Sequence, residues 1–282
     1  DMASLDKAIA ELERQQVEAV AVCYLHSWKD PSHERATAEA VKAAMPGVYG
    51  SLSSAVLPQI KEFERVSTTV VNAYVGPKLE RYLTNLEVRL REAGYAGPVL
   101  IIQSHGGVAT IAEAYRLAAG GVVSGPAGGG AGSRYAARRM KHGDLIAFDM
   151  GGTSTDISLV VKGEAAIASD RRLGGERVAL QSLDIASIGA GGGSIAHVDA
   201  GGVLHVGPES AGAEPGPACY GRGGTRAAVT DSNLVLGYLD PTSFLGGRAR
   251  PALAAPGAAV DPAAAAPEGA RIGAAAGTPP DP

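Results

Sequence analysis

The chain has 282 residues, 39 glycines and a formal net charge of −4, and 45% of its residues are hydrophobic against 19% charged. This length can bury a core, and the glycines, at about twice their usual share of about 7%, have no period of three, which excludes collagen. The acidic balance and the lack of an apolar run of about 18 residues predict no nucleic-acid partner and no membrane partner.

Two cysteines, Cys23 and Cys219, are too few for a disulfide framework or for a thiolate zinc site. The chain begins with an acidic, helix-like segment that has no features of a secretory signal. Both observations favour a reducing compartment, so we expect a cytoplasmic protein.

The first 60 residues alternate between helical and strand patterns. Residues 4–16 predict an amphipathic helix with Ser4 as its N-cap. A buried strand is predicted over 18–25, a second helix over 32–45 and a second strand over 48–53. This alternation is typical of an α/β fold.

The central third is predicted to be mainly helical. Residues 61–93 have a helical pattern, with a break or kink expected at Gly76-Pro77. A short apolar strand over 98–103 leads into Ser104-His105-Gly106-Gly107. Residues 122–139 predict a strand end, a glycine turn and then a helix of small residues.

The last third is predicted to be rich in strands. A strand over 145–149 is followed by a glycine turn and a β-branched strand that ends at Val161. Residues 178–207 predict further strands, with a hairpin around Gly201. After a Pro/Gly-rich loop over 207–224, Thr230-Asp231 is predicted to cap a short helix to about Leu239.

The clearest motif is the sequence LIAFDMGGTSTDISLV at residues 145–160. Glycines let backbone N–H groups face phosphate oxygens without a Cβ in the way, and the three hydroxyls add donors. An aspartate at a strand end, here Asp149, can hold Mg²⁺ or orient an attacking water. An ordinary hairpin turn is the alternative, but the hydroxyls and the flanking apolar strands favour a phosphate-binding loop.

Two further glycine-rich segments leave alternatives open. The chain has no Gly-Lys dipeptide, so a Walker A loop is excluded. The segment from Gly189 to Ser194 is compatible with a nucleotide loop or with a structural turn. The segment from Gly125 to Gly130 precedes a predicted helix, where it could bind an anion or serve as a hinge or close-packed helix start.

Isolated histidines and cysteines favour structural roles. His105 at a strand end could belong to a site loop, but a hydrogen-bonded structural role is favoured. His197 and His205 are expected to face each other across the hairpin as surface residues, because two histidines alone make a poor metal site. Cys219 could be reactive if its pKa were lowered, but packing is favoured. No Gly-x-Ser-x-Gly sequence occurs, which argues against an α/β-hydrolase nucleophile.

Several motifs together resemble those of the hydantoinase/oxoprolinase family, in its A-type subunit, and the glycine turn resembles the second phosphate loop of the sugar kinase, actin and chaperone ATPases. The resemblance extends from about Val17 to Gly247. It rests on Gln103–Gly107, Ser124–Gly129, Asp149–Asp156, Gly189–Ser194, Val206–Gly212, Pro215–Gly221 and Thr230–Gly237.

The resemblance implies a two-lobed, actin-like α/β fold with ATP and Mg²⁺ between its lobes. It implies that Asp149 acts on Mg²⁺ or on the attacking group, and that Asp156 braces the loop or shares the metal. It also implies residues that bind the nucleotide, which are Gly151, Gly152, Thr153, Ser154 and Thr155, together with Gly189, Gly191, Gly192, Gly193 and Ser194.

The chain departs from the family pattern at both ends. It has one Asp-x-Gly-Gly-Thr sequence where the family has two. We expect residues 1–60 to be the remnant of an N-terminal domain, 61–247 the ATPase domain and 248–282 a disordered Ala/Pro/Gly-rich tail. One lobe would then be largely complete and the other truncated, so the chain is expected to be a fragment.

The function that the resemblance implies is ATP-dependent hydrolysis of a cyclic amide, such as hydantoin, N-methylhydantoin or 5-oxoproline. A B-type subunit or domain is the expected partner. One alternative within the family is a subunit of an ATP-dependent ketone carboxylase. An alternative from another class is a non-catalytic protein that binds ATP and regulates a partner.

Overall fold

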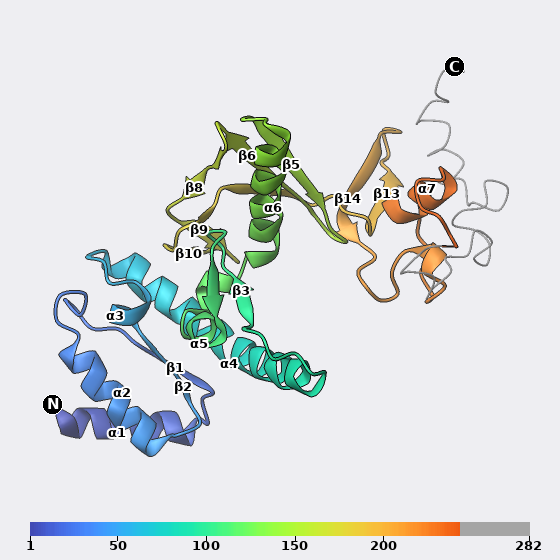
Figure 1. The fold of residues 1–282 in the computed structure, drawn as a ribbon. Helices are drawn as coiled ribbons and strands as arrows, with labels where there is room; N and C mark the ends of the chain where they lie inside the picture. Colours follow the sequence, from blue (N-terminus) through green and yellow to red (C-terminus); the bar gives the residue numbers. More distant parts are fainter. Residues whose placement is uncertain (243–282) are drawn as a thin grey trace. The chain divides into compact units, whose positions relative to one another are not determined.

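The structure is a computed structural model that describes residues 1–242 (Figure 1). The described residues divide into two compact units, the first formed by residues 1–145 and 158–184, the second by residues 146–157 and 185–242. The predicted tail over 248–282 lies outside the described residues. The predicted domain boundaries at residues 60 and 247 stay a prediction.

The first unit begins with the predicted alternation of helices and strands. Its elements are α1 (Met2–Arg14), β1 (Ala19–Val22), α2 (Ser32–Ala44) and β2 (Tyr49–Leu52). The two strands pair in parallel, with Ala19 opposite Tyr49, and α2 forms the crossover between them. The α/β class is therefore confirmed in this region.

The predicted N-cap of the first helix is wrong. Asp1 caps α1, because its carboxylate accepts a hydrogen bond from the Ala3 N–H at 3.1 Å. Ser4 lies in the first turn, and its hydroxyl donates to the Asp1 carbonyl at 2.9 Å. Both residue types are good caps, and the chain uses the earlier one.

A small hydrophobic core joins α1 and α2 to the two strands. Ile9, Val41 and Met45 are buried at its centre. The partly buried residues that pack against this centre are Leu5, Leu12, Val20, Ala40 and Val48. Helix α4 packs on the same strands, as Figure 1 shows.

Of the break or kink predicted at Gly76-Pro77, the break is wrong, because α4 continues through it from Glu62 to Glu92 after the short α3 (Ser53–Val56). A kink there stays a prediction. A Cβ on Gly76 would lie 2.2 Å from the Tyr49 ring. The glycine therefore lets an aromatic ring lie against the helix. Packing of this kind can hold a helix together at a proline that removes one backbone hydrogen bond.

Asn72 connects α4 to the elements on both sides of it. Its Nδ2 donates to the Ser51 hydroxyl at 2.9 Å and to the Arg116 carbonyl at 3.2 Å, and its Oδ1 accepts from the Ala119 N–H at 2.9 Å. Asn72 is fully buried. A buried amide that is satisfied in this way fixes the position of the helix.

Within residues 122–139, the predicted helix is present, but the strand end and glycine turn predicted before it are absent. The glycines lie inside α6 (Ser124–Met140). A Cβ on Gly130 would lie 2.9 Å from the Leu183 side chain, so a glycine allows close packing there. The preceding elements are β3 (Leu100–Ile102), β4 (Val108–Thr110), α5 (Ile111–Arg116) and the 3₁₀ helix η1 (Ala118–Gly121).

The strands β5 and β6 after α6 agree with the prediction, whereas the short strands between residues 164 and 177 were not predicted. A sheet has the order β12-β6-β5, and β7 pairs with the end of β6. Two short pairs, β9 with β10 and β8 with β11, belong to the first unit. The bounds are β5 (Leu145–Met150), β6 (Thr155–Val161), β7 (Glu164–Ala165), β8 (Ile167–Ala168), β9 (Arg171–Leu173), β10 (Glu176–Val178), β11 (Ser182–Leu183) and β12 (Ile185–Ile188).

Up to residue 242, the second unit also contains a hairpin and a short helix. The predicted hairpin around Gly201 is confirmed as β13 (Ser194–Val198) and β14 (Leu204–Ser210). The 3₁₀ helix η2 (Ala218–Tyr220) precedes α7 (Val229–Val235). The expected cap is confirmed for Asp231, whose carboxylate accepts from the Ala228 N–H at 2.8 Å at the start of α7. The N-cap residue itself is Ala228, and the helix ends at Val235, short of the expected Leu239.

A buried carboxylate stabilises the first unit. Glu34 is fully buried and accepts hydrogen bonds from the Ser53 hydroxyl at 2.5 Å, the Ser54 N–H at 2.8 Å and the Tyr24 N–H at 3.0 Å. Burial raises the pKa of Glu34, but these hydrogen bonds outweigh it and leave the pKa below its ordinary value of 4.5. The carboxylate thus contributes stability above that ordinary pKa and loses it as the pH falls through the folded value.

We expect Glu34→Gln to lower the free energy of unfolding by about 1–3 kcal/mol at pH 7, because the amide can serve only some of these donors. Urea unfolding of the purified chain from pH 7 down to pH 3 measures this. The variant should also show a flatter decline toward acid than the parent. Parallel declines in both proteins would contradict the role of Glu34.

Candidate functional site

The predicted phosphate-binding loop is the turn of a hairpin. Strands β5 and β6 are neighbours in the sheet and are joined by residues 151–154. The Gly151 N–H donates to the Ser154 carbonyl at 2.8 Å and closes the turn. A connection this short requires an antiparallel pair, so the sequence pattern of strand, glycine turn and strand is confirmed.

The tip of this turn presents unpaired hydrogen-bond donors. Within residues 1–242, the N–H groups of Gly152 and Thr153 have no acceptor, and both residues are exposed. The hydroxyls of Thr153 and Ser154 also have no partner in this part of the chain. Adjacent N–H groups beside hydroxyls can surround the oxygens of a phosphate.

The second glycine-rich segment lies directly against this turn. The Gly192 N–H donates to the Gly151 carbonyl at 2.9 Å, and the Gly193 N–H donates to the Gly152 carbonyl at 2.6 Å. A Cβ on Gly191 would lie 2.6 Å from the Ser154 nitrogen, which only glycine permits. We call this contact between residues 151–154 and 189–194 the glycine interlock.

The interlock uses the donors of the second segment. The Gly191 N–H donates to the Ser194 hydroxyl at 2.7 Å, and the Ser194 N–H donates to the Gly191 carbonyl at 3.0 Å. The structure therefore brings the two predicted segments together, but their backbone N–H groups have different roles. The first segment has free donors, whereas the second braces it.

Thr155 also faces the brace. Its side chain is fully buried, and its hydroxyl donates to the Ala190 carbonyl at 2.5 Å. This predicted nucleotide-binding residue therefore points into the interlock instead of toward solvent. Threonine supplies both the hydroxyl and a β-branched side chain suited to the first position of β6.

A third segment supports the interlock from behind. Both the N–H and the hydroxyl of Thr230 donate to the Gly192 carbonyl, at 2.8 and 2.7 Å. The buried Asp231 carboxylate accepts from the N–H groups of Cys219 and Ala228, each at 2.8 Å. The sequence predicted only a helix cap at Thr230-Asp231, and no local pattern indicates this supporting role.

Cys219 is buried, as a packing residue would be. Burial raises the pKa of its thiol to about 12, and the neighbouring Asp231 carboxylate contributes to the increase. A thiol with such a pKa is almost entirely protonated at neutral pH. A reactive thiolate at Cys219 is therefore not supported.

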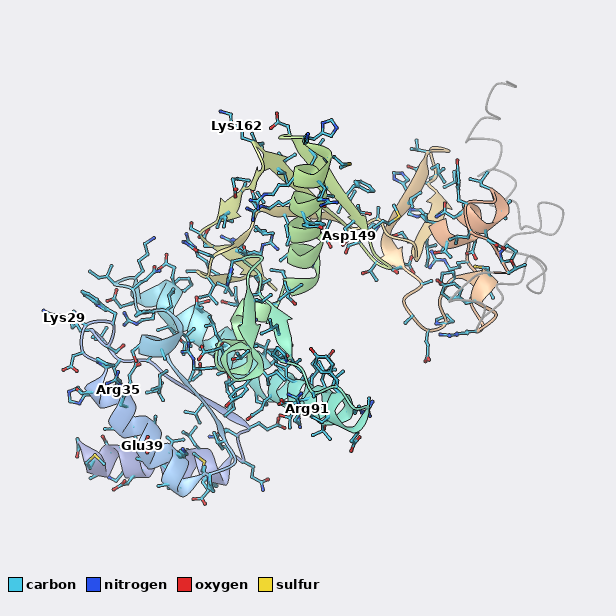
Figure 2. The ribbon with its side chains drawn as sticks, viewed as in Figure 1. Lys29, Arg35, Glu39, Arg91, Asp149 and Lys162 are labelled. Atoms are coloured by element: carbon cyan, nitrogen blue, oxygen red, sulfur yellow. The ribbon has the colours of Figure 1, made fainter. Side chains whose placement is uncertain are left out.

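The two predicted catalytic aspartates differ in their surroundings. Asp149, near the end of β5, is exposed and has no hydrogen-bond or ion-pair partner in the described part of the chain (Figure 2). Asp156 is partly buried, and its carboxylate accepts a short hydrogen bond from the Ser187 hydroxyl of β12. Asp149 is therefore free to bind a ligand, while Asp156 is held by the sheet.

No pre-formed metal cluster accompanies Asp149. Among residues 1–242, no group of three or more His, Cys, Asp or Glu side chains could hold a metal ion. One carboxylate is still enough where a bound phosphate and water supply the remaining ligands of Mg²⁺. The donor set thus fits a metal that arrives with a nucleotide.

The other sequence candidates lie elsewhere in the fold. His105 sits in the β3–β4 turn, where its Nδ1 accepts from the Gly107 N–H at 3.1 Å. His197 and His205 are opposite each other in the hairpin, as predicted, with ring centroids 5.4 Å apart. His205 also binds the Asp199 carboxylate at 2.8 Å.

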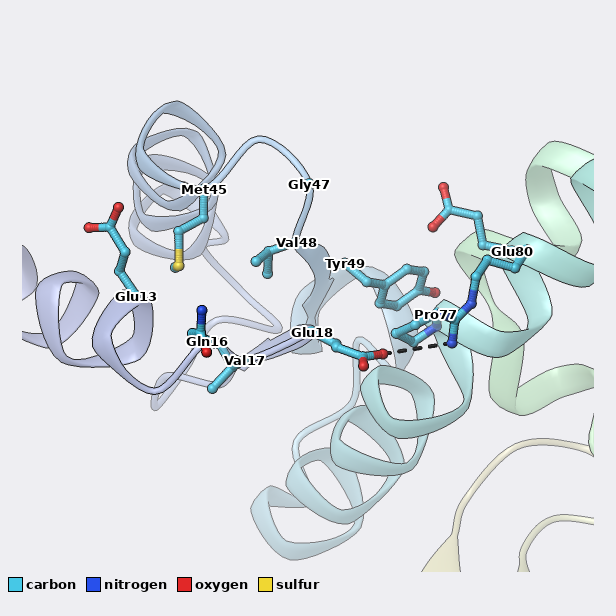
Figure 3. A pocket seen from close by; sticks show the side chains of 11 residues that line it. Glu13, Gln16, Val17, Glu18, Met45, Gly47, Val48, Tyr49, Pro77 and Glu80 are labelled. Carbon is cyan, nitrogen blue, oxygen red and sulfur yellow. Dashed lines mark ion pairs between the residues drawn. The ribbon is translucent and has the colours of Figure 1, made fainter.

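A cavity in the first unit contains none of these candidates. It has a volume of about 480 Å³, and its mixed lining contains the apolar Val17 and Met45 as well as the acidic Glu13, Glu18 and Glu80 (Figure 3). Glu18 pairs with Arg81 at 3.7 Å.

Comparisons with known proteins agree with the motifs. A family model described as "Hydantoinase/oxoprolinase" matches residues 65–272, and a model of the "Hydantoinase/oxoprolinase N-terminal region" matches residues 1–45. These matches cover most of the chain.

The relatives are longer proteins. Caprolactamase subunit alpha of Pseudomonas jessenii is 42% identical over 250 residues, which cover 89% of this chain and 36% of that protein. 5-Oxoprolinase 1 of Arabidopsis thaliana is 38% identical over 229 residues, which cover 81% of this chain and 18% of that protein. The chain thus spans about a third, or less, of the length of these relatives.

A solved structure shares the fold. The nucleotide-free structure of acetone carboxylase, from a study of ATP-dependent acetone carboxylation, matches with a TM-score of 0.72 at 29% identity. The match covers 88% of this chain and 35% of that one. The predicted α/β fold is therefore confirmed as that of ATP-dependent enzymes of this type.

We expect Gly191→Ala to lower the free energy of unfolding by about 1–3 kcal/mol, because the added methyl collides with the backbone of the opposing turn. Gly152→Ala is the matched control. A Cβ at that position has no atom within 4 Å, so its effect should stay within about 0.5 kcal/mol. Urea unfolding of both variants measures the difference, and equal stabilities would show that the interlock is not tightly packed.

Proposed function

The chain belongs to the hydantoinase/oxoprolinase family, and from this membership we propose that it carries the phosphate-binding loop of an ATP-dependent enzyme that opens a cyclic amide. The observation that carries the proposal is the row of free donors at Gly152 and Thr153 near the unpaired carboxylate of Asp149. Exposed donors beside a carboxylate that has no protein partner are available to a phosphate and its metal ion.

The loop residues suit the two groups that such an enzyme binds. The N–H groups of Gly152 and Thr153, with the hydroxyls of Thr153 and Ser154, would hold the phosphates. Asp149 would hold Mg²⁺, which needs few protein ligands when phosphate is present. Bound MgATP would supply a phosphoryl group to the amide oxygen, which makes the ring easier to open.

The remaining residues keep this loop in place. Thr155 and the interlock fix the backbone before any ligand arrives, so the donors need little rearrangement on binding. Asp156 would brace the loop through Ser187 rather than bind metal. The segment from Gly189 to Ser194 would act mainly as this brace.

The substrate class is proposed from the relatives. Caprolactamase and 5-oxoprolinase are both named for cyclic amides. We propose a substrate of the same class, such as a hydantoin or 5-oxoproline, and a B-type partner, since the caprolactamase relative is a subunit. Within the described residues, no helix is long and apolar enough to span a membrane. The cytoplasm stays our proposed location.

Acetone carboxylase supports a second candidate function, because its solved structure shares this fold. In that case the second substrate would be a ketone, and bicarbonate would be needed. ADP release by the complete protein with its partner separates the two functions. Stimulation by hydantoin, N-methylhydantoin or 5-oxoproline without bicarbonate supports the amide reading, whereas stimulation only by ketone with bicarbonate overturns it.

We expect Asp149→Asn to lower the rate of ATP turnover by the complete protein about a hundredfold or more, because a metal-binding charge is lost while the shape is kept. ADP release at saturating MgATP measures this. Asp6 is an exposed aspartate on α1, so Asp6→Asn is the control for loss of a surface charge. Its rate of ATP turnover should equal that of the parent. Turnover at the parental rate in Asp149→Asn would show that the site is assigned wrongly.

A further inference from the structure

A second cavity lies in the first unit, beside the β3–β4 turn. Its volume is about 460 Å³, within the usual range for small-molecule sites. Three glutamines, Gln59, Gln103 and Gln181, line it together with charged groups that include Lys61 and Arg177. The proposed phosphate-binding function uses none of these residues.

One of the two cationic side chains in this cavity has no ion-pair partner among the described residues. Arg177 pairs with Glu64 at 3.1 Å and with Asp170 through two nitrogens, so these three groups satisfy one another. Lys61 is exposed and has no acidic partner among the described residues. A lysine placed in this way can pair with a carboxylate on a ligand.

The neutral groups suit an amide. Gln103 is buried, with 4% of its surface exposed, and its Oε1 accepts no hydrogen bond from the described part of the chain. This oxygen can accept from an amide N–H. His105 accepts at Nδ1 from the Gly107 N–H, so its neutral ring carries the proton on Nε2. That N–H can donate to an amide carbonyl.

From these groups we infer that the cavity binds a small cyclic amide that carries a carboxylate, with Gln103 and His105 facing the amide and Lys61 facing the carboxylate. The choice of a cyclic amide rests on the proposed function, but the recognition groups come from the cavity itself. A substrate such as 5-oxoproline meets both requirements. Caprolactam and hydantoin lack the carboxylate.

Isothermal titration of the purified chain tests this without ATP turnover. The probes are 5-oxoproline and 2-pyrrolidone, which is the same ring without the carboxylate. We expect 5-oxoproline to bind about tenfold more tightly than 2-pyrrolidone, because one charged contact is gained. Equal affinities, or no binding of either compound at millimolar concentration, would overturn the inference.

Substitutions of Lys61 and Gln103 test which side chain contacts which part of the ligand. Lys61→Gln should weaken 5-oxoproline binding about tenfold and leave 2-pyrrolidone binding unchanged. Lys29→Gln is the matched control, because Lys29 is another exposed lysine, labelled in Figure 2, that does not line the cavity. Gln103→Leu should weaken the binding of both compounds. Since Gln103 is buried, a circular dichroism spectrum like that of the parent is required before that result is used. An unchanged affinity for 5-oxoproline in Lys61→Gln would contradict the inference, whatever Gln103→Leu does.

The same samples separate this inference from the proposed function. Titration with MgADP reports on the phosphate-binding loop, which is built from different residues. Binding of 5-oxoproline without binding of MgADP would support the cavity and count against the loop. Binding of MgADP alone would support the loop and reject the cavity.

Discussion

The second unit depends on one contact, the glycine interlock between residues 151–154 and 189–194. Two short hydrogen bonds, from Gly192 to Gly151 and from Gly193 to Gly152, join two turns that are far apart in the sequence. The backbones approach so closely that a methyl group on Gly191 has no room. Thr155 and Thr230 then add their hydroxyls to the carbonyls of the second segment. A loop held on this side is fixed before it meets a ligand.

This arrangement separates binding from support. The N–H groups of residues 190–194 are used inside the protein, whereas those of Gly152 and Thr153 are available at the surface. Asp149 and Asp156 differ in the same way, since one carboxylate is free and the other is bound by Ser187. The first unit uses buried polar groups for similar support. Glu34 and Asn72 each accept or donate several hydrogen bonds that fix neighbouring elements.

Local patterns predicted the elements well where a single segment decides its own structure. The hairpin at residues 145–161, the two strands β1 and β2, and the facing histidines of the β13–β14 hairpin all agree with the periodicity and turn residues. The errors fall where a distant contact overrides a local preference. At Gly76, where α4 continues, the Tyr49 ring packs against the helix, and within α6 the Leu183 side chain packs on Gly130.

The sequence by itself determined the family, the α/β class and the loop that contains Asp149, because these depend on residue types in a fixed order. Only the tertiary structure decided which glycines bind and which brace. The reason is physical, since a backbone N–H is the same donor in every glycine, and only its neighbours show whether it is already used. The cavity around Gln103 and Lys61 was hidden for the same reason, because it gathers residues from four separate parts of the chain.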